Sequence, residues 1–257
     1  MKKLELTHSI GDILNLVDSA PTWSKELKEK AVERQKNLLK PANSLGQLED
    51  IAVFLSSWGK KTMKDMEKIS TIVFAGNHGV CRQSVNPFPQ EVTFQMVETF
   101  KLGKAAINKI CESNEINLEV IPIDLEKPTA DISIGRAMDE TEFIESFNIG
   151  LRAVSENMDL ITLGEMGIGN TTIASALCYY FFNHDVSSWV GPGTGSNQDQ
   201  VIHKGKIIER AVKTNRPGIV RPLDAGVSLG GREQAAICGA VVAAKHYSVP
   251  VILDGFI

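Results

Sequence analysis

The residue types best suited to chemistry gather in one glycine-rich segment, residues 164–172, which follows an apolar run. It combines a carboxylate, glycines, an amide and hydroxyls: Gly164, Glu165, Met166, Gly167, Gly169, Asn170, Thr171 and Thr172. Glycines let a ligand approach the backbone closely, and amides and hydroxyls can cap a helix or donate to an anion. A tight turn with a solvated glutamate is the plainer interpretation. The coincidence of these residue types favours a functional loop for a nucleotide or phosphate, with Glu165 as the candidate catalytic carboxylate.

A second glycine-rich segment, residues 191–197, precedes a helical stretch that carries Lys204. Its candidates for phosphate contacts are Gly193, Thr194, Gly195 and Lys204. The start of a helix and a nearby ammonium both favour a bound anion, although a flexible loop before an ordinary amphipathic helix explains the pattern equally well. For a third such segment, 226–233, a plain helix start capped by Ser228 or nearby residues is the favoured interpretation.

The turn after the first apolar run contains Asn77 and His78. The histidine could act as a general acid or base or bind substrate, but a lone histidine in a turn is more often structural. Farther on, Gln90 enters a long helical stretch, and Phe88 and Met96 could line an apolar pocket for a flat ring. Core positions for Phe88 and Met96 are at least as compatible with the sequence.

An α/β fold is expected to position these segments. Apolar runs that resemble strands alternate with helical stretches, and the strands are expected at 70–75, 118–123, 160–163, 187–190 and 249–254. Such alternation predicts a Rossmann-like, mostly parallel sheet with helices on both faces. Ligands of such sheets bind at the carboxyl ends of the strands. The glycine-rich segments should therefore lie together at one edge and accept a phosphorylated small molecule.

The N-terminal part of the chain has helical periodicity. Helices are expected at 25–40 and from Gln47 onward, and a long helix is expected from about 90 to 111. The first two predict a small N-terminal helical subdomain over residues 1–65, followed by an α/β nucleotide-binding domain over 66–257; a helical pair that packs at one end of the sheet is the alternative. The sequence stops directly after its last strand, where a covering segment is normally expected, so we expect this domain to be incomplete at its C-terminus.

Composition excludes several classes of protein. The net charge is −4 over 257 residues, which gives no indication of a nucleic-acid partner. No apolar run is long enough to span a bilayer and no signal peptide is evident, so we expect no membrane partner and a cytoplasmic location. The four cysteines are far apart in the sequence, which argues against a zinc site or a disulfide framework.

The same segments, in the same order, resemble the nicotinate-nucleotide–dimethylbenzimidazole phosphoribosyltransferase family. The matching stretches run along nearly the whole chain: 40–49, 74–80, 89–93, 164–172, 191–197, 230–231 and 249–256. The resemblance implies a homodimer that transfers phosphoribose from nicotinate mononucleotide to a benzimidazole-type base, with no metal and no other cofactor. The product would be α-ribazole phosphate, which is used in cobalamin assembly.

The resemblance also implies roles for individual residues. Glu165 and the loop after it would hold the nucleotide, and the second glycine-rich segment with Lys204 would contact its phosphate. The acceptor base would be flanked by Asn77, His78, Phe88, Gln90 and Met96. In some family members polar side chains stand at the positions of Phe88 and Met96, so a different benzimidazole, a purine or a phenol is also a candidate acceptor.

One departure from the family concerns catalysis. The family's main catalytic carboxylate lies in a Gly-Glu-Gly loop near the C-terminus, and this sequence contains no Gly-Glu-Gly. The acceptor nitrogen must lose a proton as it attacks the ribose, so we expect little turnover from this sequence, with Glu165 in a supporting role. The alternative is a catalytically impaired or non-catalytic paralogue that binds a nucleotide or a partner subunit.

Overall fold

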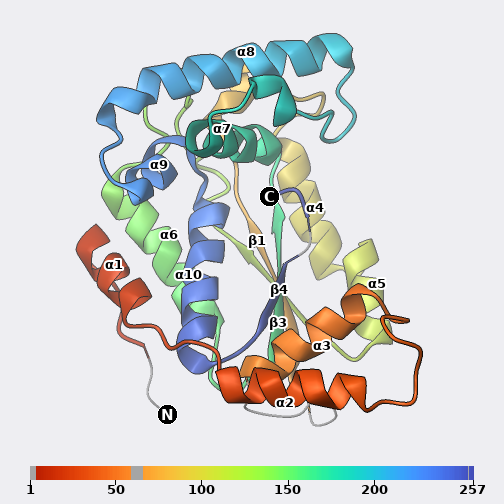
Figure 1. The fold of residues 1–257 in the computed structure, drawn as a ribbon. Coiled ribbons are helices and arrows are strands. Elements are labelled where there is room, and N and C mark those ends of the chain that lie inside the picture. The colour runs from red at the N-terminus through yellow and green to blue at the C-terminus, as the bar shows by residue number, and fades with distance from the viewer. Residues whose placement is uncertain (1–3, 59–65, 254) are drawn as a thin grey trace.

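A parallel four-stranded sheet forms the centre of the computed structural model, which describes residues 4–58, 66–253 and 255–257 (Figure 1). The strands lie in the order β2 (Asn117–Pro122), β1 (Ile69–Ala75), β3 (Leu160–Met166) and β4 (Val251–Leu253). All neighbouring pairs are parallel, and β1 pairs with β3 from Ile69 beside Leu160 to Ala75 beside Met166. The predicted α/β class with a Rossmann-like sheet is confirmed.

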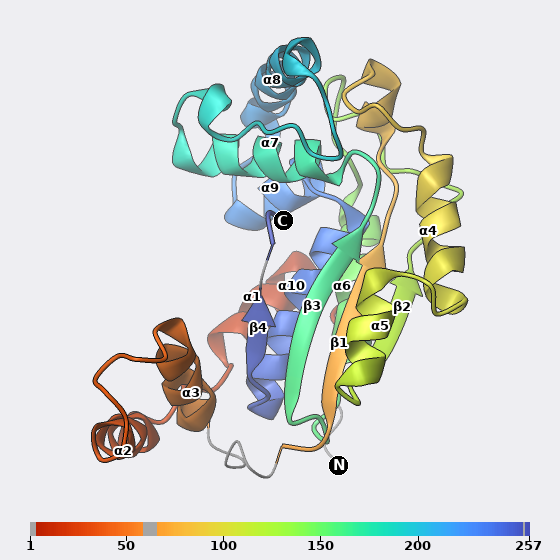
Figure 2. The ribbon, with the colours of Figure 1, turned by 90° about the vertical axis from the view of Figure 1, so that its right-hand side faces the viewer.

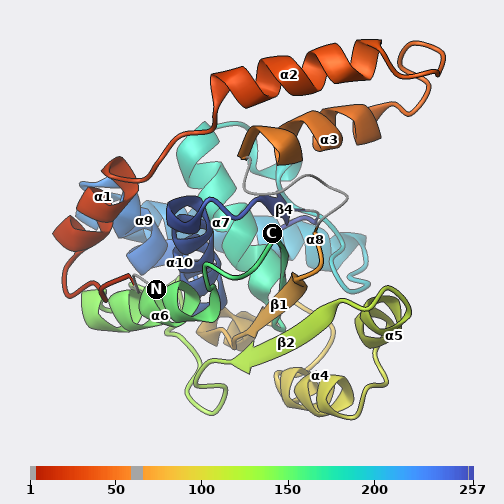
Figure 3. The ribbon, with the colours of Figure 1, turned by 90° about the horizontal axis from the view of Figure 1, so that it is seen from below.

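Helices cover both faces of the sheet (Figures 2 and 3). One face carries α6 (Glu140–Ala153) and α10 (Arg232–Tyr247), and the other carries α4 (Glu91–Lys101) and α5 (Ala106–Ser113). Ile72 and Phe74 of β1 belong to the main core, which includes α6 and α10. Ala75 packs instead with Val97 of α4. Because both of its faces are buried, the central strand β1 is a mostly apolar run in the sequence.

Helices α6 and α10 pack closely because each has a glycine at their contact. A Cβ atom on Gly150 of α6 would overlap the carbonyl oxygen of Ala236, and one on Gly239 of α10 would overlap that of Phe147. A side chain at either position would force the two backbones apart. The buried face of α10 is otherwise mostly alanine, at Ala235, Ala236, Ala240, Ala243 and Ala244, so the close approach continues along the helix.

Three helices lie above the carboxyl ends of the strands: α7 (Asn170–Phe182), α8 (Gln198–Asn215) and α9 (Pro222–Leu229) (Figure 1). Helix α7 begins four residues after β3 ends, and a 3-10 helix, η2 (Gly79–Gln83), follows β1 on the same side. The predicted glycine-rich segments connect these elements, so they meet at one edge of the sheet.

The N-terminal helices differ in where they pack. Helix α1 (Ile10–Asp18) buries Ile10 and Ile13 in the main core. Helices α2 (Lys25–Lys36) and α3 (Gln47–Trp58) instead pack on each other, at the end of the molecule opposite α7 and α8 (Figures 1 and 2). The predicted boundary after residue 65 adjoins residues 59–65, which lie outside the described residues, so the division into two domains stays a prediction.

Two predicted elements differ from the structure in type or in number. Residues 187–190, expected as a strand, include a turn of 3-10 helix, η3 (Val186–Ser188), which Asp185 caps by accepting a hydrogen bond from the backbone N–H of Ser187 at 2.9 Å. The single helix expected over 90–111 is two helices, α4 and α5. They are separated at Gly103, whose φ of +68° is a left-handed conformation that ends a helix.

Two other boundaries are shifted. The helix expected at 25–40 ends at Lys36, because the side-chain amide of Asn37 donates to the carbonyl oxygen of Glu33 at 3.0 Å and caps the last turn. The strand expected at 160–163 continues to Met166, since its pairing with β1 extends that far.

The interpretation of Ser228 as a helix cap is also wrong. Ser228 lies inside α9, and Gly230 and Gly231 separate α9 from α10. Of the strand expected at 249–254, β4 is observed and Asp254 lies outside the described residues. None of the described helices is both long and apolar enough to cross a membrane.

Candidate active site

Glu165 lies within β3, one residue before the strand ends. It pairs with Phe74 of β1, so its side chain lies on the face of the sheet that α10 covers. Nδ2 of Asn170 donates a hydrogen bond to its carboxylate. Burial raises the pKa of Glu165 to about 7; the charge of Glu233 adds to that rise, and His78 opposes it. A carboxyl group with such a pKa can accept or release a proton at neutral pH.

His78 and Glu233 form a buried ion pair near this carboxyl group. Both side chains are fully buried, and Nε2 of His78 lies 3.2 Å from Oε1 of Glu233. His78 stands at the start of η2, and Glu233 lies in the first turn of α10. Glu233 is not among the residues predicted from the sequence. Its only signal there is its place at the end of the third glycine-rich segment, 226–233.

The first predicted loop joins β3 to α7, and side chains from other parts of the chain hydrogen-bond to its backbone. Gly169, immediately before α7, has a φ of +95°, which favours glycine. The backbone N–H of Ile168 donates to Oγ1 of Thr93 at 3.1 Å, and Sγ of Cys81 donates to the carbonyl oxygen of Ile168 at 3.1 Å. No side chain of the described residues caps the start of α7, which favours an anion there.

The second predicted loop meets the first at Lys204 and Thr171. Nζ of Lys204, a residue that is 2% exposed, donates a hydrogen bond to the carbonyl oxygen of Gly191 at 3.3 Å. A Cβ atom on Gly193 would lie 3.2 Å from Oγ1 of Thr171 and 3.5 Å from that ammonium nitrogen. Burial lowers the pKa of Lys204. Within the described part of the chain this ammonium has no carboxylate partner, which favours a bound anion.

The other predicted residues of the two loops lie around these contacts. Thr172 is fully buried in α7, whereas Thr194 and Gly195 are exposed in the second loop. Met166 packs with the cluster around Val97, on the face of the sheet opposite Glu165. The structure therefore brings most of the predicted nucleotide residues together but turns Met166 away from them.

The residues predicted to flank the acceptor lie near the same edge, and two of them are engaged with the backbone. Nδ2 of Asn77 donates to a loop carbonyl oxygen at 3.0 Å, and Nε2 of Gln90 donates to the carbonyl oxygen of His78. Phe88 is 46% exposed, and Met96 is half-buried on α4. Neither is a fully buried core residue, and the acceptor-binding roles of all five stay predictions.

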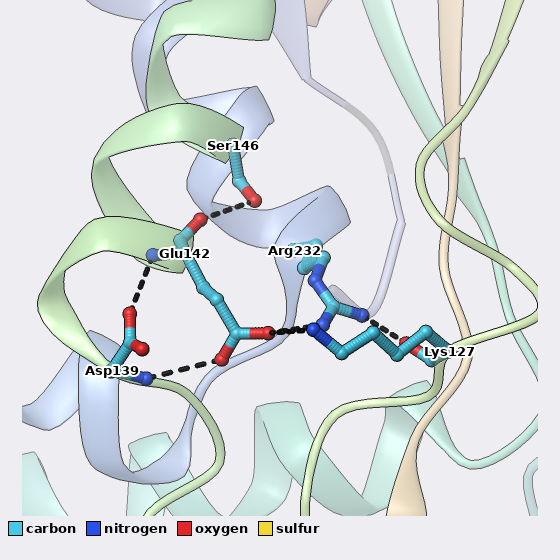
Figure 4. A network of polar contacts seen from close by, with 5 residues as sticks. All are labelled: Lys127, Asp139, Glu142, Ser146 and Arg232. Carbon is cyan, nitrogen blue, oxygen red and sulfur yellow. Dashed lines mark hydrogen bonds and ion pairs between the residues drawn. The ribbon is translucent and has the colours of Figure 1, made fainter.

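A polar network fixes the start of α10, where Glu233 lies (Figure 4). The buried guanidinium of Arg232 donates to the carbonyl oxygen of Lys127 and, at 2.7 Å, to Oε1 of Glu142 on α6. The backbone N–H of Asp139 donates to the other oxygen of Glu142 at 3.2 Å. Partial burial acts to raise the pKa of Glu142, but the hydrogen bonds and the charge of Arg232 outweigh it, so this pKa lies below its usual value.

A cavity of about 310 Å³ involves a different part of the molecule, around α9. It is lined by Arg136, Glu140, Gly218, Val220, Arg221, Asp224, Val227 and Ser228. Ion pairs hold Arg221 there, at 2.7 Å to Asp224 and 2.9 Å to Glu140. Among the described residues, no group of three or more His, Cys, Asp or Glu side chains is arranged to hold a metal ion.

The parallel sheet, the glycine-lined loops at its carboxyl edge and the buried lysine are features of a phosphoribosyltransferase, and residues 20–257 match the family model described as Phosphoribosyltransferase. The nicotinate-nucleotide–dimethylbenzimidazole phosphoribosyltransferase of Rhodobacter capsulatus is 42% identical over 250 residues, which are 97% of this chain and 74% of the relative. That of Brucella canis is 45% identical over 230 residues, 89% of this chain and 68% of the relative. The chain therefore belongs to the nicotinate-nucleotide–dimethylbenzimidazole phosphoribosyltransferase family.

Solved structures agree with this assignment. The crystal structure of CobT from Thermus thermophilus matches with a TM-score of 0.79 at 31% identity, over 90% of this chain and 75% of that chain. A second structure from the same organism, titled as the same phosphoribosyltransferase, matches with a TM-score of 0.79 at 29% identity. The similarity covers the sheet and the helices that position the candidate site.

Proposed function

We propose that this protein transfers the phosphoribosyl group of nicotinate mononucleotide to a 5,6-dimethylbenzimidazole-type base. The products are nicotinate and α-ribazole phosphate, which supplies the lower ligand of cobalamin. The observation that carries the proposal is the meeting of the two loops: Gly193 lies next to both Thr171 and the ammonium of Lys204. Thr171 follows Asn170, which is hydrogen-bonded to Glu165. The proposed anion site beside Thr171 and the titratable carboxyl group bound by Asn170 are therefore linked through two consecutive residues.

The loops suit the donor nucleotide. We place the phosphate of nicotinate mononucleotide at Lys204 and the start of α7, where an ammonium and the positive end of the helix dipole favour negative charge. Glu165 is placed beside the ribose, whose hydroxyls can donate to a carboxylate. Its hydrogen bond from Asn170 holds the carboxyl group at the strand end, and the ribose lies between the two sites.

The reaction forms one bond and breaks another at the anomeric carbon. The acceptor nitrogen attacks C1′ of the ribose, the bond from C1′ to the nicotinate nitrogen breaks, and its electron pair stays on that nitrogen. The acceptor ring loses its N–H proton, and Glu165, with a pKa of about 7, can accept a proton near neutral pH. We expect the loops to contribute more to the rate by holding both reactants in line than Glu165 contributes by accepting the proton.

The acceptor and the assembly state are part of the proposal. Phe88, with its exposed ring, and Met96 are placed beside the flat acceptor, and a homodimer in the cytoplasm is the proposed working form. Light scattering during size-exclusion chromatography tests the dimer, which requires twice the 28.1 kDa mass of one chain. A monomer at micromolar concentration would contradict it.

The activity is tested by incubating the protein with nicotinate mononucleotide and 5,6-dimethylbenzimidazole. Nicotinate and α-ribazole phosphate, separated by chromatography and identified by mass, should form in equal amounts and only when both reactants are present. Calorimetry with nicotinate mononucleotide alone measures binding separately. A folded protein that binds no nicotinate mononucleotide would overturn the proposal.

The same two measurements address the expected slow turnover, which stays a prediction. Tight binding of nicotinate mononucleotide without any product would favour the non-catalytic alternative. Product formed at a rate proportional to protein concentration, and reduced in the Glu165→Gln variant, would favour transfer. Replacing 5,6-dimethylbenzimidazole with adenine or phenol in the same assay ranks the candidate acceptors.

A further inference from the structure

A contribution to the stability of the folded protein does not explain why His78 and Glu233 are paired in the interior. Neither side chain is exposed, and within the described residues neither ring nitrogen of His78 and neither carboxylate oxygen of Glu233 forms a hydrogen bond. An ion pair removed from water usually contributes little or nothing to stability compared with an apolar pair of the same size. A pair with so few supporting contacts therefore calls for another role.

The sequence makes room for this pair at three separate places. A Cβ atom on Gly76 would overlap Oε2 of Glu233. One on Gly231 would lie 2.6 Å from Cε1 of His78 and 2.6 Å from Oε1 of Glu233, and one on Gly167 would lie 3.3 Å from Nε2 of His78. Gly167 belongs to the segment 164–172, which the sequence marks as a ligand loop, and its lack of a side chain also accommodates the ion pair.

The pair lies at the ends of β1 and β3, and β3 carries Glu165. Gly76 directly follows β1 and adjoins Glu233, and Gly167 directly follows β3 and adjoins the imidazole of His78. Gly167 is only two residues after Glu165, whose side chain lies on the face of the sheet that α10 and Glu233 cover. Charges on Glu233 and His78 therefore act on the Glu165 carboxyl group, in opposite directions.

We propose that His78 and Glu233 are positioning residues for Glu165: together they set the charge that the carboxyl group at the end of β3 carries when substrate binds. This inference rests on the proposed function, in which Glu165 meets the ribose and the acceptor proton. In this role the two fully buried side chains act through Glu165. A positive charge on His78 favours the ionised form of Glu165, and a negative charge on Glu233 opposes it.

The test is the titration of Glu165 in the protein without ligands, followed by NMR of 13C-labelled glutamate carboxyls and assigned with Glu165→Gln. Glu233→Gln leaves Glu165 as the carboxyl group beside the imidazole, so its midpoint should fall by about one pH unit or more. His78→Gln leaves two carboxyl groups with no cation, so the higher of their two midpoints should rise by about as much. Glu112→Gln, which removes an exposed glutamate paired with Lys109, is the control and should change neither midpoint.

Opposite shifts support the proposal, because a merely structural role would not move the midpoint in two directions. An unchanged Glu165 midpoint in both folded variants overturns it. Should the single variants fail to fold, the wild-type protein still decides: the Glu165 resonance must respond to the titration of His78, followed by 13C labelling of the ring, and independent titrations overturn the proposal. Because no ligand is used, the result is separate from that of the binding and transfer assays.

Discussion

The ammonium of Lys204 donates a hydrogen bond to the carbonyl oxygen of Gly191, 3.3 Å away, and so lies against the loop that precedes its own helix. This contact holds a buried positive charge beside the second glycine-rich segment. Gly193 of that segment lies next to both this ammonium and Thr171, and so links the second segment to the first.

Replacing Lys204 by glutamine should weaken binding of nicotinate mononucleotide by about 10-fold to 100-fold, which corresponds to losing a charge-assisted hydrogen bond. The free energy of unfolding should change little. The substitution loses one hydrogen bond, but it also removes the cost of burying an ammonium that has no carboxylate partner among the described residues. Calorimetry and thermal unfolding measure the two effects. Lys206→Gln, an exposed position on the same helix, is the matched control, and equal losses in both variants would contradict the assignment of Lys204.

Replacing Glu165 by glutamine should change how stability depends on pH. The pKa of this group is raised from 4.5 to about 7 in the folded protein, so between these values the folded state holds a proton that the unfolded state has lost. The free energy of unfolding of the wild-type protein should therefore fall as pH rises from 4.5 to about 7. That of Glu165→Gln should not show this decrease, because the variant lacks the titrating group. Its free energy of unfolding relative to wild type should be about 2 kcal/mol more favourable at pH 8 than at pH 5.

Denaturant unfolding at several pH values measures this difference. Glu98→Gln, an exposed glutamate on α4 whose partner is Lys101, serves as the control. A relative stability of Glu165→Gln that stays constant from pH 5 to pH 8 would show that Glu165 is not perturbed in the folded protein.

Replacing Gly150 by alanine should destabilise the protein by about 1–3 kcal/mol, because the added methyl group would overlap the carbonyl oxygen of Ala236 and push α6 away from α10. Thermal unfolding followed by circular dichroism measures the loss. At Gly135 a Cβ atom would meet nothing within 4 Å, so Gly135→Ala is the matched control and should be close to neutral. Similar melting temperatures for the two variants would refute this view of the helix contact.

Replacing Arg232 by methionine should cost about 2–4 kcal/mol, because it removes the buried cation 2.7 Å from Glu142 and leaves the carbonyl oxygen of Lys127 without its donor. The ammonium of Lys127, which is exposed and 3.6 Å from Glu142, is a weaker partner. The pKa of Glu142 is depressed below 4.5, so its stabilising effect is present above that pH and is lost as pH falls through the folded-state pKa. The difference between wild type and variant should shrink below about pH 4 in urea titrations. A difference independent of pH would contradict the ion pair.

Local sequence patterns were enough to predict most of the sheet. Strands β1 and β3 are largely buried, so each appears as a mostly apolar run in the sequence. The segment 187–190, which ends in Trp189 and Val190, forms 3-10 helix at its start, because Asp185 and Ser187 make a local hydrogen bond that no hydropathy pattern reports. The break at Gly103 depends on a positive φ, which a glycine permits but does not require.

The candidate site was only partly predictable. Glu165, Asn170 and Thr171 lie close in sequence, so their contacts follow from one loop. Glu233 comes to Glu165 only through the packing of α10 on the sheet, and nothing in the local sequence around it indicates that approach. Asn77 and Gln90 were predicted to meet a ligand, whereas their amides are bonded to backbone carbonyl oxygens.

The glycine contacts between α6 and α10 bear on how such an enzyme can change. Because the backbones of α6 and α10 are in contact at Gly150 and Gly239, the two helices cannot shift relative to each other without overlap. This buried contact therefore fixes the position of the first turn of α10, which carries Glu233. Selection for a new acceptor can remodel the surface loops freely, yet it should leave Gly150 and Gly239 intact. Residues that never meet a ligand would then be as intolerant of substitution as those that do.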